Sequence, residues 1–264
     1  MINLKFGLFW SGCKLSYLRY LTFKTLRHYH PDSEIELYTT DKFRTDGYSW
    51  DVEKQDFELE NDGKDYMDDL KYLDVKILPC NQFEDYAPNY QSDFFRWWWL
   101  KDNSGFYLDT DQIILKPFDS LPLGYDLIFT GYKALSCGFY TPVGVIGSNK
   151  HKIVDYINAL LPQFYTAKNY NSLGPFMFHH VLNMEAEKLK RLVNVPSRWF
   201  YPVPESYQII EAYRGECEVP DDSYAFHWFG GHPFSQQFNK VYTEEYAQKS
   251  KDTISKTLRE KGII

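Results

Sequence analysis

The sequence has little cysteine, no excess of basic residues and no long apolar run. Its four cysteines (Cys13, Cys80, Cys137 and Cys217) form no CxxC pair, which favours free thiols in a reducing compartment over disulfides or a zinc site. The net charge of −7 argues against nucleic acid as a partner, because binding to a polyanion needs a basic surface. No stretch approaches the roughly 18 apolar residues of a transmembrane helix, and the apolar start is too short for a signal peptide. These absences predict a cytoplasmic protein without a transmembrane segment.

Aromatic residues are abundant, at 19% of the 264 residues. Aromatic rings fill protein cores, and they also stack on sugars and nucleotide bases, so this composition is compatible with either kind of ligand. The length suits one large domain or two small ones. Because no linker-like segment interrupts the chain, we expect a single domain over residues 1–264.

Strand-like and helix-like segments alternate through the first two thirds of the chain, which predicts an α/β fold with helices flanking a sheet. A polar, acidic excursion at 41–70 reads as a solvated surface segment. The predicted strands are 2–10, 34–40, 75–79, 106–111, 126–130, 137–140 and 143–147. The predicted helices are 17–29, 92–103, 151–164, 172–192 and 243–262.

Two aspartates, Asp109 and Asp111, close the apolar strand in GFYLDTDQII. Like charges so close together repel each other, unless a cation lies between them. Carboxylate oxygens suit Mg²⁺ or Mn²⁺, and ligands of open α/β sheets bind at the carboxyl ends of strands. The pair therefore predicts a divalent metal site.

The segment SDFFRWWWLKDNSGFYLDTDQIILKP, residues 92–117, resembles the DXD-type glycosyltransferases of the GT-A fold, in particular glycosyltransferase family 32. The similarity lies in the order and spacing of Ser-Asp, an Arg three residues later, a helix, a Gly and a strand closing on Asp-x-Asp. Weaker similarities are FWSG, LYTTD, NSLGPFMF and AFHWFGG. The resemblance implies a single-domain GT-A-like (Rossmann-like) mixed sheet flanked by helices.

The resemblance also implies an activity, the transfer of a sugar from a nucleotide-diphosphate sugar to a hydroxyl acceptor such as a glycan or polysaccharide. It implies retention of anomeric configuration and Mn²⁺ or Mg²⁺ as cofactor. A UDP-sugar is the preferred donor and a GDP-sugar the alternative. The nucleotide-binding half would span about 1–118, the acceptor-side half about 119–242, and a C-terminal helix 243–264.

The resemblance further assigns roles to four residues. Asp109 would contact the donor directly or through the metal, and Asp111 would ligate the metal at the diphosphate. Asp93 and Arg96, one turn apart on a helix, would hold hydroxyls of the donor sugar. The alternative for Asp93 and Arg96 is a helix-start charge with a surface ion-pair partner.

Further candidates lie elsewhere in the chain. His227 in AFHWFGG completes the metal shell if it acts as in many GT-A enzymes, and otherwise packs in the core beside a tryptophan. Trp10, Tyr38 and Thr39, at two strand ends, would border the nucleotide base. The paired His179-His180 are expected to be structural. Asn171 and Ser172 are expected to cap a helix, with hydrogen bonds to a sugar hydroxyl as the alternative.

Two other functions fit parts of the sequence. A strand followed by Asp-x-Asp is also the nucleophile motif of haloacid-dehalogenase-type phosphatases, in which Asp109 would attack phosphate. That motif normally lies on the first strand, and Ile113 stands where such enzymes have Thr or Val. A non-catalytic carbohydrate-binding protein is the third interpretation.

Overall fold

The computed structural model describes residues 4–12, 14–40, 63–122, 124–134, 138–149, 152–167, 169–185, 191–203 and 208–264. The strands are β1 (Lys5–Trp10), β2 (Glu34–Thr39), β3 (Val75–Pro79), β4 (Ser104–Leu108), β5 (Gln112–Ile114), β6 (Leu127–Thr130), β7 (Tyr132–Ala134), β8 (Gly138–Tyr140), β9 (Val145–Asn149), β10 (Leu192–Val195) and β11 (Ala225–His227). The α-helices are α1 (Tyr17–Tyr29), α2 (Pro88–Asp102), α3 (Lys152–Phe164), α4 (Met177–Glu185), α5 (Ile209–Arg214), α6 (Pro233–Val241), α7 (Glu244–Lys249) and α8 (Thr253–Glu260). Shorter helical turns are Met67–Leu73, Phe118–Ser120, Ser172–Phe176 and Ser197–Trp199.

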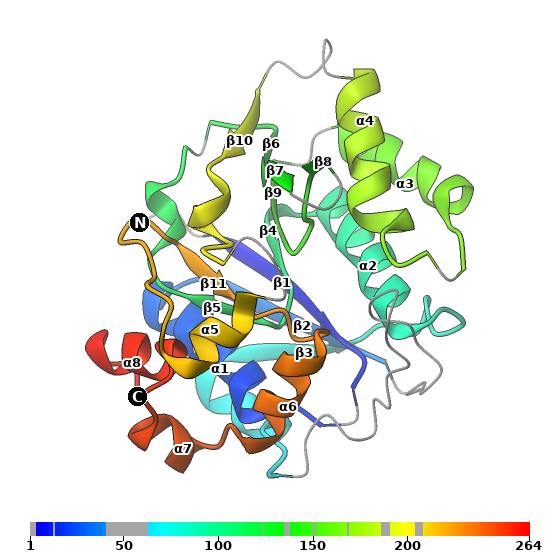
Figure 1. The fold of residues 1–264 in the computed structure, drawn as a ribbon. Coiled ribbons are helices and arrows are strands. Elements are labelled where there is room, and N and C mark those ends of the chain that lie inside the picture. Colours follow the sequence, from blue (N-terminus) through cyan, green and yellow to red (C-terminus); the bar gives the residue numbers. More distant parts are fainter. Residues whose placement is uncertain are drawn as a thin grey trace.

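A mixed seven-stranded sheet runs through the molecule in the order β10-β6-β9-β4-β1-β2-β3 (Figure 1). Strand β1 pairs in parallel with β2 and β4, and β2 pairs in parallel with β3. Strand β9 is antiparallel to both of its neighbours, β4 and β6. The carboxyl ends of β1 and β4 therefore lie at the same edge of the sheet, as parallel strands require. The prediction of an α/β mixed sheet flanked by helices is confirmed.

Helices cover both faces of this sheet (Figure 1). Alternation along β4 shows the two layers, since Tyr107 belongs to one hydrophobic cluster while Phe106 and Leu108 belong to the other. Helices α2, α3 and α4 supply the cluster around Tyr107. Helix α1 and the C-terminal helices α5, α6 and α8 pack in the other cluster.

Two glycines allow close packing around β1. At Gly7 in β1, an added Cβ would lie 2.3 Å from the Trp99 indole, so the missing side chain makes room for that ring of α2. At Gly105 the backbone has a φ of 149°, and a Cβ would lie 2.1 Å from the carbonyl oxygen of Lys5. Only glycine fits that conformation and that contact, which holds β4 close to β1.

The structure corrects two of the predicted helices. Helix α2 begins at Pro88 rather than at 92, because Ala87 is extended and proline favours the first helical position. The tail is two helices, since Asp252 accepts a hydrogen bond from the Ser255 amide and caps α8 separately. Strand β11 (Ala225–His227) matches none of the predicted elements. Most of the predicted excursion, 41–62, lies outside the described residues.

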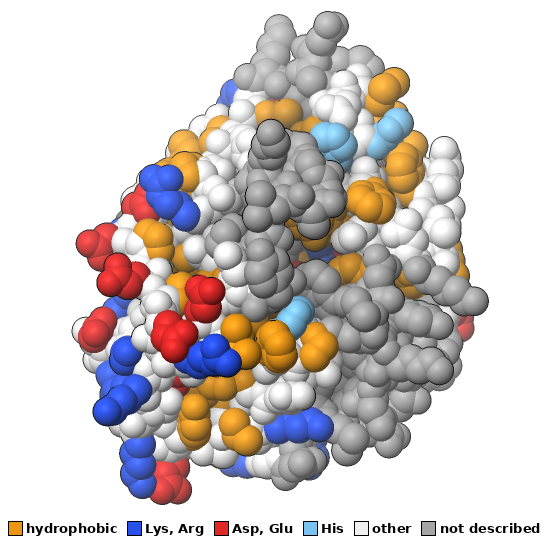
Figure 2. All heavy atoms as spheres, in the orientation of Figure 1, with side chains coloured by type: hydrophobic (Ala, Val, Ile, Leu, Met, Phe, Trp, Pro, Cys, Tyr) orange, Lys and Arg blue, Asp and Glu red, His pale blue; other side chains and the backbone are white. Residues whose placement is uncertain are grey.

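The surface shown in Figure 2 carries Lys and Arg interspersed with Asp and Glu over the C-terminal helices. The described part of this face therefore lacks the single-sign basic patch that nucleic acid would need. Within the described ranges, no helix is both long enough and apolar enough to cross a bilayer.

Candidate active site

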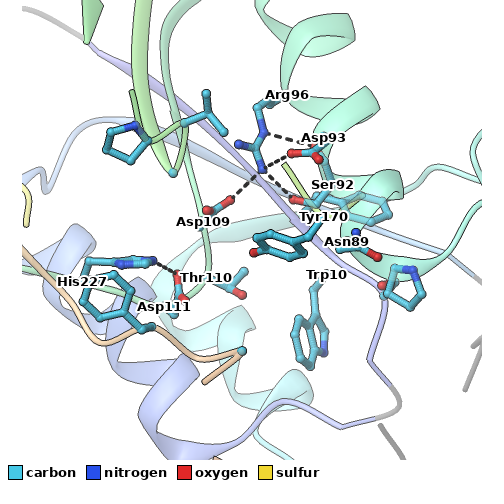
Figure 3. A pocket seen from close by; sticks show the side chains of 18 of the residues that line it. Trp10, Asn89, Ser92, Asp93, Arg96, Asp109, Thr110, Asp111, Tyr170 and His227 are labelled. Carbon is cyan, nitrogen blue, oxygen red and sulfur yellow. Dashed lines mark hydrogen bonds and ion pairs between the residues drawn. The ribbon is translucent and has the colours of Figure 1, made fainter. Parts of the chain in front are cut away.

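A cavity of about 190 Å³ opens at the carboxyl ends of β1 and β4 (Figure 3). It contains six of the predicted site residues, Trp10, Asp93, Arg96, Asp109, Asp111 and His227. Its other lining residues are Phe9, Ser11, Gly12, Arg19, Pro88, Asn89, Ser92, Thr110, Tyr140, Pro142, Val143, Gly144, Tyr170, Pro175, Tyr201, Phe229 and Gly231.

The Asp-Thr-Asp turn between β4 and β5 is held by its backbone and by helix α1. The Asp109 amide donates to the carbonyl of Gly144 at 2.8 Å, which fixes the start of the turn. Thr110 is bound twice, because Arg19 donates to its hydroxyl at 2.9 Å and the Thr22 hydroxyl donates to its carbonyl at 2.7 Å. Hydrogen bonds within the protein thus hold the turn in place, as a preorganised site requires.

Asp109, Asp111 and His227 each present a ligand atom to one point, and these atoms lie within 4.8 Å of one another. Strand β11 explains the arrangement, because its antiparallel pairing with β5 places His227 opposite Gln112, next to Asp111. The His227 Nε2 is 3.1 Å from Asp111 Oδ1 (Figure 3). His227 therefore faces the cavity rather than the core.

The segment after β11 wraps around Asp111. The Trp228 amide donates to the Asp111 carbonyl at 3.1 Å, and the Gly230 amide donates to its Oδ2 at 2.7 Å. Between them, Phe229 has a φ of 51°, a left-handed conformation that is strained for a bulky side chain. Burial alone would raise the pKa of Asp111, but His227, Arg19 and the Gly230 amide together lower it to about 2. Asp111 is therefore a carboxylate at neutral pH.

These three residues fit a divalent cation. Two carboxylates and an imidazole form a set of ligands that suits Mn²⁺ well. The carboxylate oxygens of the same set suit Mg²⁺. The Nδ1 of His227 is buried and has no hydrogen-bond partner in the described part of the chain, so the ring is not committed to a structural hydrogen bond on that side. Asp111 is held by the protein through Oδ2, which leaves Oδ1 facing His227.

A second charged cluster lies on α2 beside this group. Arg96 Nη2 lies 3.0 Å from Asp93 Oδ1 and 3.4 Å from Asp109 Oδ1. The Tyr107 hydroxyl contacts the same oxygen of Asp109 at 2.5 Å, and Ser92 Oγ lies 2.7 Å from that hydroxyl. Arg96 therefore connects the Asp93 carboxylate on α2 to Asp109 in the Asp-Thr-Asp turn.

Burial and charge set the ionisation of this cluster. Burial raises the pKa of Asp93 to about 7, although the adjacent Arg96 partly offsets it. Burial would lower the pKa of Arg96, but Tyr107, Asp109 and Asp93 raise it above its ordinary value, so Arg96 stays cationic. Asp93 is 6% exposed and Arg96 is 4% exposed. The alternative of a helix-start charge with a surface ion-pair partner is thus wrong.

Other predicted residues fall elsewhere. Tyr38 and Thr39 do not line the described cavity, since Tyr38 packs against Phe95 and Trp98. Their place at the base stays a prediction. His179 Nε2 lies 3.0 Å from the side-chain nitrogen of Asn183 on the same helix, and His180 packs against Phe164. Both contacts are consistent with structural roles.

The predicted caps also differ from the structure. The Asn171 side chain makes no capping hydrogen bond, and Gly174 interrupts the regular helix there. Ser172 Oγ instead accepts from the Thr166 amide at 3.5 Å.

Sequence reasoning did not single out Tyr107, Gly144 or Arg19. Tyr107 could have been found, because it lies two positions before Asp109 on a strand and therefore shares its face. Gly144 and Arg19 carry no signal in the sequence. Gly144 matters because an added Cβ would lie 2.6 Å from Asp109 Oδ2, and Arg19 because it lies over the rings of Trp10 and Trp228.

Comparison with protein families agrees with this geometry. Residues 19–128 match the family described as "Glycosyltransferase sugar-binding region containing DXD motif". The matched region includes Asp93, Arg96, Asp109 and Asp111, whereas His227 lies beyond it. No curated protein matches the chain in sequence.

Comparison with solved structures identifies the fold. The PaToxG glycosyltransferase superimposes with a TM-score of 0.51 at 15% identity, covering 98% of this chain and 87% of that chain. The apo-form glycosyltransferase GlyE of Streptococcus pneumoniae TIGR4 gives a TM-score of 0.50 at 14% identity, covering 99% of this chain and 64% of that chain. This chain thus spans about two thirds of the length of GlyE. These structural matches show a fold of the GT-A type, and the family match over residues 19–128 includes the Asp-Thr-Asp turn. Its assignment to family 32 stays a prediction.

Proposed function

We propose that the protein transfers a sugar from a nucleoside-diphosphate sugar to a hydroxyl group of a glycan or polysaccharide, with a divalent cation and with retention. One observation carries the proposal, namely that a single cavity holds both the Asp109–Asp111–His227 group and the Asp93–Arg96 pair. A UDP-sugar is the preferred donor, and a GDP-sugar is the alternative.

Each part of the cavity has a defined task in this proposal. Asp109, Asp111 and His227 would hold Mn²⁺ or Mg²⁺. When bound, the ion would neutralise charge that develops on the leaving diphosphate. Trp10, at the end of β1, would border the nucleotide.

Arg96 and Asp93 would orient the donor sugar. A guanidinium donates hydrogen bonds only, while a carboxyl with a pKa near 7 can accept and, when protonated, donate. The pair can thus bind several hydroxyls of one sugar. Because both groups are buried, these hydrogen bonds are shielded from water and hold the sugar in one orientation.

The chain would then divide into a nucleotide-binding half at about 1–118 and an acceptor-side half at about 119–242. Helices α2 and α1 belong to the first half, whereas Tyr140, Tyr170 and Tyr201 bring aromatic side chains to the cavity from the second. Aromatic side chains suit the apolar faces of an acceptor sugar.

The phosphatase alternative is less well supported. The Asp-x-Asp turn follows the fourth strand along the chain rather than the first, and the sheet contains the antiparallel strand β9. The carbohydrate-binding alternative predicts ligand binding without turnover. Release of UDP from a panel of UDP-sugars separates the transferase from both alternatives.

The test of the metal site is Asp111→Asn. This variant keeps the size of the side chain and removes its charge, so we expect Mn²⁺-dependent binding of UDP to be lost while the far-UV circular dichroism is unchanged. Asp32→Asn, at an exposed carboxylate outside the cavity, is the control and should bind like wild type. Wild-type UDP affinity in Asp111→Asn would show that the metal assignment is wrong.

A further inference from the structure

Asn89 places an unsatisfied amide in the cavity. Both its side-chain nitrogen and its side-chain oxygen are shielded from solvent, and neither has a hydrogen-bond partner within the described ranges. A buried polar group that makes no hydrogen bond destabilises the folded protein, so an amide left in this condition needs an explanation. A cap is not the explanation, because Ala87 is the N-cap of α2 and Asn89 lies inside the first turn.

Asn89 lies on the stripe of α2 that faces the cavity. Asn89, Ser92, Asp93 and Arg96 follow one another at helical spacing, and all four line the cavity. At 1.5 Å per residue, Asp93 is about 6 Å and Arg96 about 10 Å further along the helix axis. Because Arg96 reaches Asp109, Asn89 marks the opposite end of the stripe from the metal group, as Figure 3 shows.

The chemistry of an amide narrows the class of ligand. Its NH₂ donates and its carbonyl accepts, so a ligand that satisfies both must offer an acceptor and a donor side by side. A phosphate offers acceptors only and a metal ion satisfies the oxygen only. Ribose hydroxyls and the edges of nucleotide bases offer both.

From these observations we propose that Asn89 recognises the nucleoside of the donor, by hydrogen bonds to the ribose hydroxyls or to the base edge. The inference rests on the proposed function, which places the sugar at Asp93 and Arg96 and the diphosphate at the metal group. The nucleoside then takes the remaining end of the stripe, where Asn89 and Trp10 line the cavity.

The test is Asn89→Ala, measured by isothermal titration calorimetry with UDP and Mn²⁺. We expect UDP to bind about tenfold to hundredfold more weakly, because two hydrogen bonds are lost. Without ligand, the thermal midpoint should be equal to or above that of wild type, because the Asn89 side chain makes no hydrogen bond to the described residues and alanine favours a helix. The control is Asn183→Ala, an exposed amide outside the cavity, which should leave UDP binding unchanged.

The outcomes separate the inference from the function on which it rests. Unchanged UDP affinity in Asn89→Ala, or a loss seen only with UDP-sugars, would overturn the role at the nucleoside while leaving the proposed function standing. If wild-type protein binds neither UDP nor GDP with Mn²⁺, the proposed function itself fails and the inference falls with it. With 2′-deoxy-UDP, equal affinities of wild type and variant place the contact at the ribose 2′-hydroxyl, and an undiminished difference places it elsewhere on the nucleoside.

Discussion

Gly144 controls the position of Asp109, and Gly144→Ala should therefore weaken metal-dependent nucleotide binding. An alanine Cβ at this position would lie 2.6 Å from Asp109 Oδ2 and 3.0 Å from the Tyr201 hydroxyl. Asp109 cannot easily yield, because Arg96 and Tyr107 hold its other oxygen. Overpacking of this kind typically costs about 1–3 kcal/mol. If the side chain of Asp109 rotates to relieve the contact, that energy appears as a tenfold to hundredfold loss of UDP affinity with Mn²⁺.

Two measurements and one control test this reasoning. Calorimetry with UDP and Mn²⁺ measures the affinity of the site, and thermal unfolding without ligand shows any strain that remains in the folded protein. Either the UDP affinity or the thermal midpoint should fall, since the close contact must be relieved by moving Asp109 or kept as strain. Gly124→Ala is the control, because an added Cβ there meets no atom of the described residues within 4 Å. If Gly144→Ala matches Gly124→Ala in both measurements, the tight contact at Asp109 does not exist in solution.

Three further predictions follow from the same structure. Arg96→Ala should weaken the binding of a UDP-sugar by about 1–3 kcal/mol more than the binding of UDP, as measured by calorimetry. Equal losses of binding free energy for the two ligands would place Arg96 at the phosphates instead. Gly7→Ala should lower the free energy of unfolding in urea by about 1–3 kcal/mol because its Cβ would lie 2.3 Å from the Trp99 ring; a wild-type value would disprove that packing. Burial lowers the pKa of His30 from 6.5 to about 4, and its Nε2 accepts the Phe118 amide, so wild type should lose up to about 3 kcal/mol as pH falls from 6.5 to 4. His30→Gln should lack this part of the pH dependence, and identical urea-unfolding profiles for the two proteins would contradict it.

Much of the fold and part of the site follow from local sequence. Helical spacing predicts α1 to the residue, because it depends on local periodicity alone. The family resemblance of residues 92–117 implies that Asp93 and Arg96 share a site with the Asp-Thr-Asp turn, and Arg96 Nη2 lies 3.4 Å from Asp109 Oδ1. The predicted start of α2 is wrong because the Ser92-Asp93 pair resembles a helix start, whereas the helix begins after Ala87, at Pro88.

The rest of the site depends on contacts between distant segments. Gly230 and Asp111 are 119 positions apart, and no local pattern shows that the amide of one binds the carboxylate of the other. The short strand β11, which brings His227 to the same place, has three residues and, among the described strands, pairs with β5 alone. A segment that short carries too little periodicity to be predicted from sequence.

Arg19 shows why these distant parts behave as one unit. Its guanidinium lies 4.1 Å from the centre of the Trp10 ring and 5.2 Å from that of Trp228, and it donates to the Thr110 hydroxyl. It thus contacts the end of β1, the Asp-Thr-Asp turn and the C-terminal segment at once. Because the Gly230 amide also binds Asp111, the C-terminal segment supports the carboxylate as well as covering it. The geometry of the proposed metal site is therefore set jointly by the sheet and by the residues after β11.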